Sequence, residues 1–333
     1  MTIALALFSG GLDSILACRV VASQGIRVIA VQCVSPFFGY ELLAQETSYR
    51  EKMRQQYGIE VMLCDVSEPY LTMLRQPPHG YGKNFNPCID CKILLMRTAR
   101  EMMAAYGAEL LISGEVLGQR PMSQRLDTLR IIERDSGCEG LLVRPLCAKG
   151  LPPTKAELEG LIDREQLLGF RGRGRQPQME LAARFGITDY PSPAGGCVLT
   201  DPLLAQRIAS FYAEHDPVTV ADIRLLLVGR HFRLPHGGWL AMGRREAENE
   251  RLLGCVLPTD WEIVLVDRPG PTGVLRFAEQ PEDFALAAGL VARYGKKGEE
   301  EPTARRVLFA RGEETRELSA LPLAEPTYES WRR

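Results

Sequence analysis

The chain has 333 residues, of which 45% are hydrophobic and 25% charged, and its formal net charge is -2. This length exceeds one average domain, so two or three domains are expected, and the composition excludes a disordered or fibrous protein. A net charge near zero excludes a global basic field, so a nucleic-acid partner would have to be met by local patches.

From Thr2 to about Leu146, apolar strands alternate with amphipathic helices. Strands are expected at residues 2–8, 26–34, 59–66 and 108–115, and helices at 15–22, 41–57 and 88–106. This alternation predicts an α/β fold with a parallel, doubly wound sheet. In such sheets ligands bind at the carboxyl ends of the strands, where residues 9–14, 35–39 and 114–120 fall. We therefore expect these three loops to face one crevice.

The pattern changes twice further along the chain. From Leu151 to about Tyr212 it is mostly helical, with helices expected at 154–168, 176–187 and 201–212. Beyond residues 214–219, short strands at 237–244, 260–268 and 304–311 are interleaved with helices at 246–255 and 281–295, and residues 296–303 are expected to form a solvated loop. The predicted division is a sheet domain at 1–150, a helical subdomain at 151–212 and a C-terminal α+β domain at 213–333.

Targeting signals and cysteine usage bear on the compartment. The N-terminus has no basic region followed by an apolar core and a cleavage site, and no run approaches about 18 apolar residues, so a soluble, cytoplasmic protein without a membrane partner is expected. Nine cysteines, an odd number spread along the chain, do not suggest a disulfide framework. In a reducing compartment they suggest metal or thiol chemistry instead.

The first motif is "SGGLDS", residues 9–14, between the first strand and the first helix. A glycine-rich turn at a helix start presents backbone N–H groups and the positive end of the helix dipole to an anion, so a phosphate ligand is predicted. An ordinary tight turn is the alternative. The Walker pattern and the G-x-G-x-x-G pattern are both absent, which excludes a P-loop kinase and a dinucleotide dehydrogenase.

This stretch resembles the PP-loop of the ATP pyrophosphatase superfamily, whose members split ATP into AMP and pyrophosphate to adenylate a carbonyl oxygen. The resemblance implies an adenine nucleotide α-hydrolase-like fold, and it implies that Asp13 is catalytic and helps to hold Mg²⁺. It assigns the pyrophosphate cradle to Ser9, Gly10, Gly11, Leu12, Asp13 and Ser14. Ser113, Gly114 and Arg120 are candidates to line the nucleotide crevice, with a plain strand-end turn as the alternative.

A second motif is the C-x-x-C formed by Cys88 and Cys91 at the start of a predicted helix. Two thiols at that spacing can bind one metal or exchange a disulfide, and a helix N-terminus favours the thiolate. Two chance cysteines are the alternative. Cys197, in a glycine-framed turn, is a third candidate, and its alternative is a buried structural thiol. The other six are expected to be packing residues: Cys18, Cys33, Cys64, Cys138, Cys147 and Cys255.

A PP-loop, a C-x-x-C about 75 residues later and a lone cysteine about 100 residues beyond resemble the tRNA thiouridine synthetases over roughly residues 1–205. In that family, sulfur displaces AMP from an adenylated uridine and is carried as a cysteine persulfide or on an iron-sulfur cluster. The resemblance implies that Cys88, Cys91 and Cys197 are catalytic and hold a 4Fe-4S cluster, with a persulfide relay as the alternative. Residues 113–124 depart from the threonine-glycine-histidine segment of 2-thiouridylases, so the modified position stays open.

Two segments are candidates for RNA binding. Arg171, Arg173 and Arg175 alternate with glycines, and such a row of planar cations suits phosphates and bases, with a solubilising loop as the alternative. Arg244 and Arg245 lie at the start of a predicted helix in the C-terminal region. These five arginines are the predicted RNA contacts.

The C-terminal region has a resemblance of its own. Its segments "HFRL", "GGWLAMGR" and "EN" resemble the RNA-binding module of the NFACT group of ribosome quality-control proteins over about 100 residues. His231 and His236 have no ligand partners at metal-binding spacing, so neither is predicted to bind a metal. Trp239 is expected to be a core residue.

Together these features predict an ATP-dependent tRNA sulfurtransferase that makes thiouridine. ATP and Mg²⁺ are the expected cofactors beside the cluster or persulfide, and tRNA and an unidentified sulfur donor are the expected partners. A homodimer is left open. Two alternatives remain: a PP-loop synthetase that adenylates a small molecule, and a non-catalytic RNA-binding factor regulated by ATP.

Overall fold

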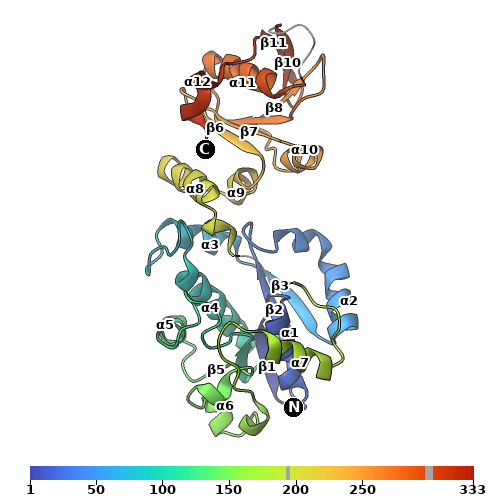
Figure 1. The fold of residues 1–333 in the computed structure, drawn as a ribbon, viewed down its shortest axis with the longest axis vertical. Helices are drawn as coiled ribbons and strands as arrows, with labels where there is room; N and C mark the ends of the chain where they lie inside the picture. The colour runs from blue at the N-terminus through green and yellow to red at the C-terminus, as the bar shows by residue number, and fades with distance from the viewer. Residues whose placement is uncertain (193–195, 297–302) are drawn as a thin grey trace. The chain divides into compact units, whose positions relative to one another are not determined.

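The computed structural model describes residues 1–192, 196–296 and 303–333, so most of the predicted loop at 296–303 lies outside the described residues. The described chain divides into two compact units, Met1–Val198 and Leu199–Arg333. Figure 1 shows the elements of both units in chain order. Each unit is described by itself below.

The described residues of the first unit form a five-stranded parallel sheet in the order β3-β2-β1-β4-β5. Its strands are β1 Ile3–Leu7, β2 Arg27–Val34, β3 Glu60–Asp65, β4 Leu110–Ser113 and β5 Leu142–Val143. The four predicted strands and the parallel sheet are confirmed. The strand order reverses between β1 and β4, which is the point where doubly wound sheets bind ligands.

Helices cover both faces of this sheet. They are α1 Leu12–Ala22, η1 Tyr40–Gln45, α2 Glu46–Tyr57, α3 Ser67–Arg75, α4 Cys88–Tyr106, α5 Leu126–Ser136, η2 Ala148–Gly150, α6 Lys155–Leu158, η3 Arg164–Gln166 and α7 Gln176–Arg184, with η4 Val198–Thr200 at the junction. Figure 1 shows α4 and α5 on one side and α1, α2 and α7 on the other. Separate apolar clusters fill the two faces, as expected when parallel strands are buried on both sides.

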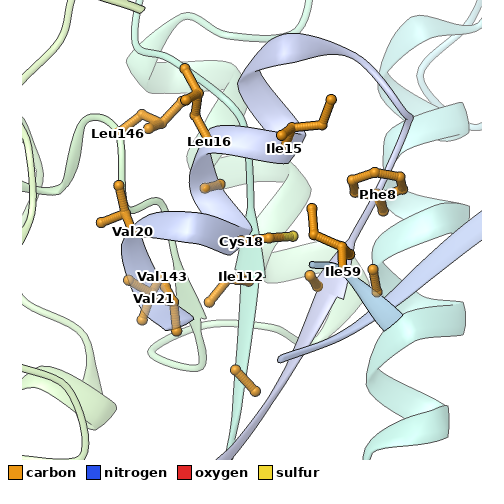
Figure 2. Close-up of a cluster of buried hydrophobic side chains, with 14 of the residues drawn as sticks. Phe8, Ile15, Leu16, Cys18, Val20, Val21, Ile59, Ile112, Val143 and Leu146 are labelled. Atoms are coloured by element: carbon orange, nitrogen blue, oxygen red, sulfur yellow. The ribbon is translucent and has the colours of Figure 1, made fainter. Parts of the chain in front are cut away.

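The packing of α1 fixes the segment that precedes it. Leu12, Ile15 and Leu16 of this helix are at most 1% exposed. Figure 2 shows its side chains gathered with Phe8, Ile112 and Val143 in one apolar cluster. Because α1 is held against the sheet along its length, the loop between β1 and α1 has a fixed position.

Residues 151–198 differ from the prediction of a helical subdomain. The helix expected at 154–168 is limited to α6 and η3, because the chain takes a left-handed conformation at Gly160, with φ +71°. Ile162, Leu167 and Leu181 belong to the same apolar cluster as α1. This segment is therefore part of the first unit, and the two-unit division differs from the three regions predicted from the sequence.

The described residues of the second unit form a six-stranded antiparallel sheet in the order β11-β10-β8-β9-β7-β6. Its strands are β6 Arg230–Arg233, β7 Trp239–Met242, β8 Trp261–Leu265, β9 Gly273–Arg276, β10 Arg305–Arg311 and β11 Glu314–Ala320. Its helices are α8 Pro202–Glu214, α9 Val220–Leu226, α10 Glu246–Leu253, α11 Pro281–Tyr294, α12 Glu325–Tyr328 and η5 Glu329–Trp331. The predicted C-terminal α+β architecture is confirmed.

Trp239 is a core residue of this unit, as predicted. It is fully buried, and its Nε1–H donates to His231 Nδ1 at 2.9 Å. The other ring nitrogen of His231 lies 2.7 Å from the carbonyl oxygen of Val228, so the neutral ring carries its proton on Nε2. Among the helices of the described residues, none is both long enough and apolar enough to cross a membrane.

Candidate active site

The segment predicted to bind phosphate, residues 9–14, lies between the end of β1 and the start of α1 and is called the phosphate loop below. Gly10 has a φ of +73°, and a Cβ atom at this position would lie 3.0 Å from the Tyr49 hydroxyl. Gly11, without a side chain, occupies the N-cap of α1 and leaves its first-turn amides open to a ligand. Ser14 Oγ donates to Gly11 O at 2.8 Å and accepts from Ser9 N at 3.3 Å, which ties the loop to the helix.

A cavity of about 700 Å³ opens directly over this loop. Its volume lies in the range of small-molecule sites. It is lined by residues of the loop, of α2 and of three later segments: Ser9, Gly10, Gly11, Leu12, Asp13, Tyr49, Lys52, Met53, Gln56, Tyr57, Gln119, Arg120, Arg175, Asp189, Tyr190, Pro191 and Ser192. The loop and Arg120, both predicted for this site, are thus brought together.

Three polar side chains meet at the floor of this cavity. Gln119 Nε2 donates to Asp13 Oδ2 at 2.9 Å, and Arg175 Nη2 lies 3.9 Å from the same oxygen. Asp13 Oδ1, Gln119 Oε1 and Arg175 Nε are buried without a hydrogen-bond partner among the described residues. Buried polar atoms are normally paired, so this arrangement favours a ligand with both anionic groups and a cation.

Ser113 and Gly114 support the loop from behind. Ser113 is 2% exposed and donates to Glu115 Oε2 at 3.2 Å. A Cβ at Gly114 would lie 2.6 Å from backbone atoms of Asp13 and Ser14, so only glycine allows this close approach. The cavity lining in the described chain includes Arg120 but neither Ser113 nor Gly114.

Glu115 anchors a buried ionic network next to this turn. Its Oε2 accepts from Arg144 Nε at 3.0 Å, and its Oε1 lies 3.7 Å from Lys92 Nζ. Burial alone would raise the pKa of Glu115, but Lys92 and Arg144 outweigh burial and hold this pKa below its ordinary value. Because Lys92 follows Cys91 in α4, the network links the turn after β4 to the helix that carries the C-x-x-C.

The three predicted cysteines are grouped around a residue that sequence reasoning missed. Tyr70 of α3 is 1% exposed, and its hydroxyl is hydrogen-bonded to the thiol of Cys91. Burial raises the pKa of Tyr70, and the nearby thiols of Cys91, Cys197 and Cys88 raise it further. Burial likewise raises the pKa of Cys91 to about 12, although Lys92 and the Tyr70 hydroxyl oppose it. All three thiols therefore lie within electrostatic reach of one phenol.

The grouping is looser than a formed metal centre. Cys88 Sγ donates to Asn86 Oδ1 at 3.3 Å. Within the described ranges, no three His, Cys, Asp or Glu side chains are arranged to hold a metal ion. The rings of Phe37 and Phe38 pack against the Tyr70 ring, one tilted and one edge-on, with centroids 5.4 Å apart. The 35–39 loop therefore lies beside Tyr70 and, contrary to expectation, does not line the cavity over the phosphate loop.

Comparisons with known proteins agree with both resemblances. Residues 2–150 match the family model described as thiamine biosynthesis protein (ThiI), and residues 229–332 match the NFACT protein RNA binding domain. Each match covers less than half of the chain. The first match contains the phosphate loop and the C-x-x-C, and the second spans all six strands of the antiparallel sheet in the described residues.

Two curated relatives match part of this chain. A probable tRNA sulfurtransferase of Thermococcus kodakarensis is 27% identical over 143 residues, which are 43% of this chain and 36% of that protein. A protein of the same description from Methanosarcina mazei is 32% identical over 117 residues, or 34% of this chain and 28% of that protein. The chain thus spans about a third of the length of the curated relatives it matches.

A solved structure of a 4-thiouridine synthetase in complex with RNA and ATP is 21% identical, covering 56% of this chain and 41% of that chain, with a TM-score of 0.39. A likeness at that level carries no argument about fold or function.

The predicted RNA-contacting arginines are divided between different places. Arg175 lies in the nucleotide cavity, whereas Arg173 is exposed and Arg171 donates to Gly150 O at 3.4 Å. Arg244 and Arg245 are exposed ahead of α10, in the region matched by the RNA-binding model. By position, Arg175 suits a phosphate group of a ligand in the cavity. Arg244 and Arg245 suit a larger anion at the surface.

A histidine that the sequence did not single out, His79, contacts the residue between the two cysteines of the C-x-x-C. His79 Nδ1 lies 2.8 Å from Asp90 Oδ1, and His79 Nε2 lies 3.0 Å from Asp135 Oδ2. Asp90 stands between the two cysteines and is 4% exposed. The sequence signal for this contact was weak, because the three residues are brought together only when α4 packs on α5.

Proposed function

We propose that this protein is an ATP-dependent tRNA sulfurtransferase that makes thiouridine. The observation that carries the proposal is the cavity over the phosphate loop, where Asp13 Oδ1 and Arg175 Nε are buried without partners among the described residues beside the open amides of α1. The phosphate loop with Asp13 and Arg120 lies within residues 2–150, which match the ThiI model, and two relatives that match part of the chain are described as probable tRNA sulfurtransferases.

ATP fits this cavity through its phosphates. The amides of Gly11 and the first turn of α1 would receive the β- and γ-phosphates, since a helix N-terminus favours anions. Arg175 and Arg120 would neutralise phosphate charge, and Asp13 Oδ1 is the oxygen donor that would hold Mg²⁺. Bound Mg²⁺ would neutralise charge on the leaving pyrophosphate.

The residues then support two displacements. A uridine carbonyl oxygen attacks the α-phosphorus of ATP and pyrophosphate leaves with the bonding electrons, which gives an adenylated uridine. A sulfur nucleophile next attacks the activated ring carbon and AMP leaves. Arg175 and the α1 amides stabilise the negative charge of the first transition state because they are fixed before the reaction.

The three thiols provide the sulfur chemistry in one of two ways. Soft thiolates suit an iron-sulfur cluster, but Cys88, Cys91 and Cys197 do not form a ligand group for a metal within the described residues. A persulfide relay needs only two thiols at a time. The outer sulfur of a persulfide on Cys197 or Cys91 attacks the uridine carbon, and the other thiol then forms a disulfide and releases the thiouridine. A thiol reductant must restore the pair.

The C-terminal unit would bring tRNA to this chemistry. Its match to an RNA-binding family model and the exposed Arg244 and Arg245 support a role in holding the RNA backbone. Phosphate contacts of this kind fix the position of an RNA but transfer no sulfur.

The test is pyrophosphate release from ATP by the full chain, with and without bulk tRNA. The proposal expects release that depends on tRNA, and a Cys91→Ser variant that still releases pyrophosphate but forms no thiouridine by nucleoside mass spectrometry. Release that needs a small molecule and no tRNA would favour a small-molecule synthetase, and ATP binding without release would favour a regulated RNA-binding factor. Iron and acid-labile sulfide in anaerobically prepared protein would favour the cluster over the relay.

A further inference from the structure

A second pair of thiols lies on the same face of the sheet as the C-x-x-C helix. Cys33 of β2 and Cys64 of β3 are direct register partners. Neighbours in register point to the same face, and both residues pack in the apolar cluster that contains Ile93 and Met96 of α4. The sequence alone suggested only packing roles for both cysteines.

Cys33 and Cys64 differ in solvent exposure and in the pKa of their thiols. Cys33 is buried at 6% exposure, whereas Cys64 is half-buried. A hydrogen bond from the Cys33 thiol lowers the pKa of Cys64 to about 7, against the effects of burial and of Asp65. The same bond and burial raise the pKa of Cys33, with a smaller effect of Cys91 and an opposing effect of Lys92. Cys64 is therefore the thiol that an incoming reagent meets as a nucleophile.

The backbone allows the two sulfurs to join. Neighbouring strands lie about 4.8 Å apart. This spacing falls within the roughly 4.4–6.8 Å that disulfides span between Cα atoms. In the sheet of the described residues, β3 is an edge strand that pairs with β2 alone.

We propose that Cys64 and Cys33 form a sulfide-releasing dithiol that accepts sulfane sulfur from a low-molecular-weight persulfide and frees it as hydrogen sulfide. The place of release rests on the proposed function, because Cys33 is within electrostatic reach of Cys91 and the sulfide would appear beside the thiols that serve thiolation. The donor is identified by its chemistry, a persulfide of a small thiol.

The steps balance in atoms and electrons. The Cys64 thiolate attacks the outer sulfur of the persulfide, and the small thiol leaves as its thiolate. The Cys33 sulfur then attacks Cys64 Sγ, the bond from this atom to the outer sulfur breaks, and hydrosulfide leaves with the bonding pair and takes up the Cys33 proton. The outer sulfur is reduced and the two cysteines are oxidised to a disulfide. A dithiol reductant supplies the two electrons that reopen it.

The experiment uses the reduced, desalted full chain mixed with glutathione persulfide, without ATP, tRNA or reductant. Released sulfide is measured colorimetrically and the protein is mapped by non-reducing mass spectrometry. The expected result is about one sulfide per chain, with a Cys33–Cys64 linked peptide. Cys33→Ser should keep one extra sulfur on Cys64 and release less sulfide than the wild type, and Cys64→Ser should take up no sulfur at this site and likewise release less sulfide.

Controls test whether the release belongs to this pair. Cys18→Ser, which changes a buried thiol on the opposite face of the sheet, should release sulfide like the wild type. Equal release by Cys33→Ser and the wild type, or a linked peptide that contains Cys91 in place of Cys33, overturns the proposal. If either serine variant unfolds, mild oxidation of the wild type must still give the Cys33–Cys64 peptide, and its absence is equally decisive. Because ATP and tRNA are absent, failure here leaves pyrophosphate release intact.

Discussion

The two carboxylate oxygens of Asp13 differ in their surroundings. One carboxylate oxygen is fixed by Gln119, and the other is buried and partnerless among the described residues. A fixed but unsatisfied oxygen is preorganised for a cation, since it loses little conformational freedom on binding. Arg175 Nη2 lies 3.9 Å from Asp13 Oδ2, so its positive charge partly offsets the negative charge of the carboxylate.

Asp13→Asn should therefore lower pyrophosphate release by roughly a hundredfold or more, because it removes a charge on which both Mg²⁺ and Arg175 depend. The amide preserves the shape of the side chain, so the thermal midpoint should change little. The measurement is the rate of pyrophosphate release over a range of Mg²⁺ concentrations. Gln119→Leu is the matched control, because it removes the hydrogen bond and keeps the charge, and its loss should be smaller. Wild-type turnover by Asp13→Asn would contradict this role.

The position of the phosphate loop depends on one close contact between the residue after β4 and the start of α1. Gly114 follows β4 directly, and a Cβ there would lie 2.6 Å from the backbone of Asp13 and Ser14. Backbone atoms cannot move aside as a flexible side chain can. The phosphate loop therefore keeps its position only while this residue is glycine.

Gly114→Ala should destabilise the protein by about 1–3 kcal/mol and weaken ATP binding, since overpacking displaces the start of α1. Thermal unfolding followed by circular dichroism and ATP titration check the two effects. Gly174→Ala is the control, because nothing lies within 4 Å of its added methyl group. If both alanines behave alike, the close contact does not position the loop.

The stability of the second unit should depend on pH through His231. Burial, aided by Arg207 and Arg244, holds the pKa of His231 well below its usual value. Below about pH 6.5 the unfolded chain takes up a proton that the folded ring excludes, so stability should fall by up to about 1.4 kcal/mol per pH unit as the pH drops.

Urea unfolding followed by tryptophan fluorescence checks this prediction, because Trp239, Trp261 and Trp331 all lie in the second unit. Between pH 7.5 and 5.5 the wild type should lose more stability than His231→Gln, which has no ring to titrate. The difference between the two proteins cancels the other titrating groups. Parallel pH profiles would show that the ring is protonated in the folded state.

These elements also show how far sequence reasoning reaches. The strands of the first unit follow from apolar runs, and the phosphate loop follows from glycines at a strand-to-helix junction, because both signals are local. Tyr70, Gln119 and the Cys33–Cys64 pair could not be predicted, since their roles arise from register and packing between distant segments. The helix expected at 154–168 failed at Gly160, where a left-handed residue ends the segment.

For the whole molecule, the two units have separate apolar cores and separate family matches. Changes to the basic patch formed by Arg244 and Arg245 on the second unit should then alter RNA affinity without altering ATP binding by the first unit. Arg244 and Arg245 are both exposed ahead of α10, and Arg244 N donates to Glu248 Oε2 at 2.7 Å, which fixes the backbone at this point. The two guanidinium groups are thus presented from a defined turn.

The double variant Arg244→Gln, Arg245→Gln should bind tRNA more weakly and with a shallower salt dependence than the wild type. Two lost phosphate contacts should reduce the slope of log K against log salt by about 1.5, since each contact releases a bound counterion. ATP affinity should be unchanged. Arg306→Gln is the matched control, because Arg306 is also exposed but is paired with Glu317 at 2.5 Å. Filter binding at several salt concentrations measures the slopes, and equal slopes for the double variant and the wild type would exclude these arginines from the RNA interface.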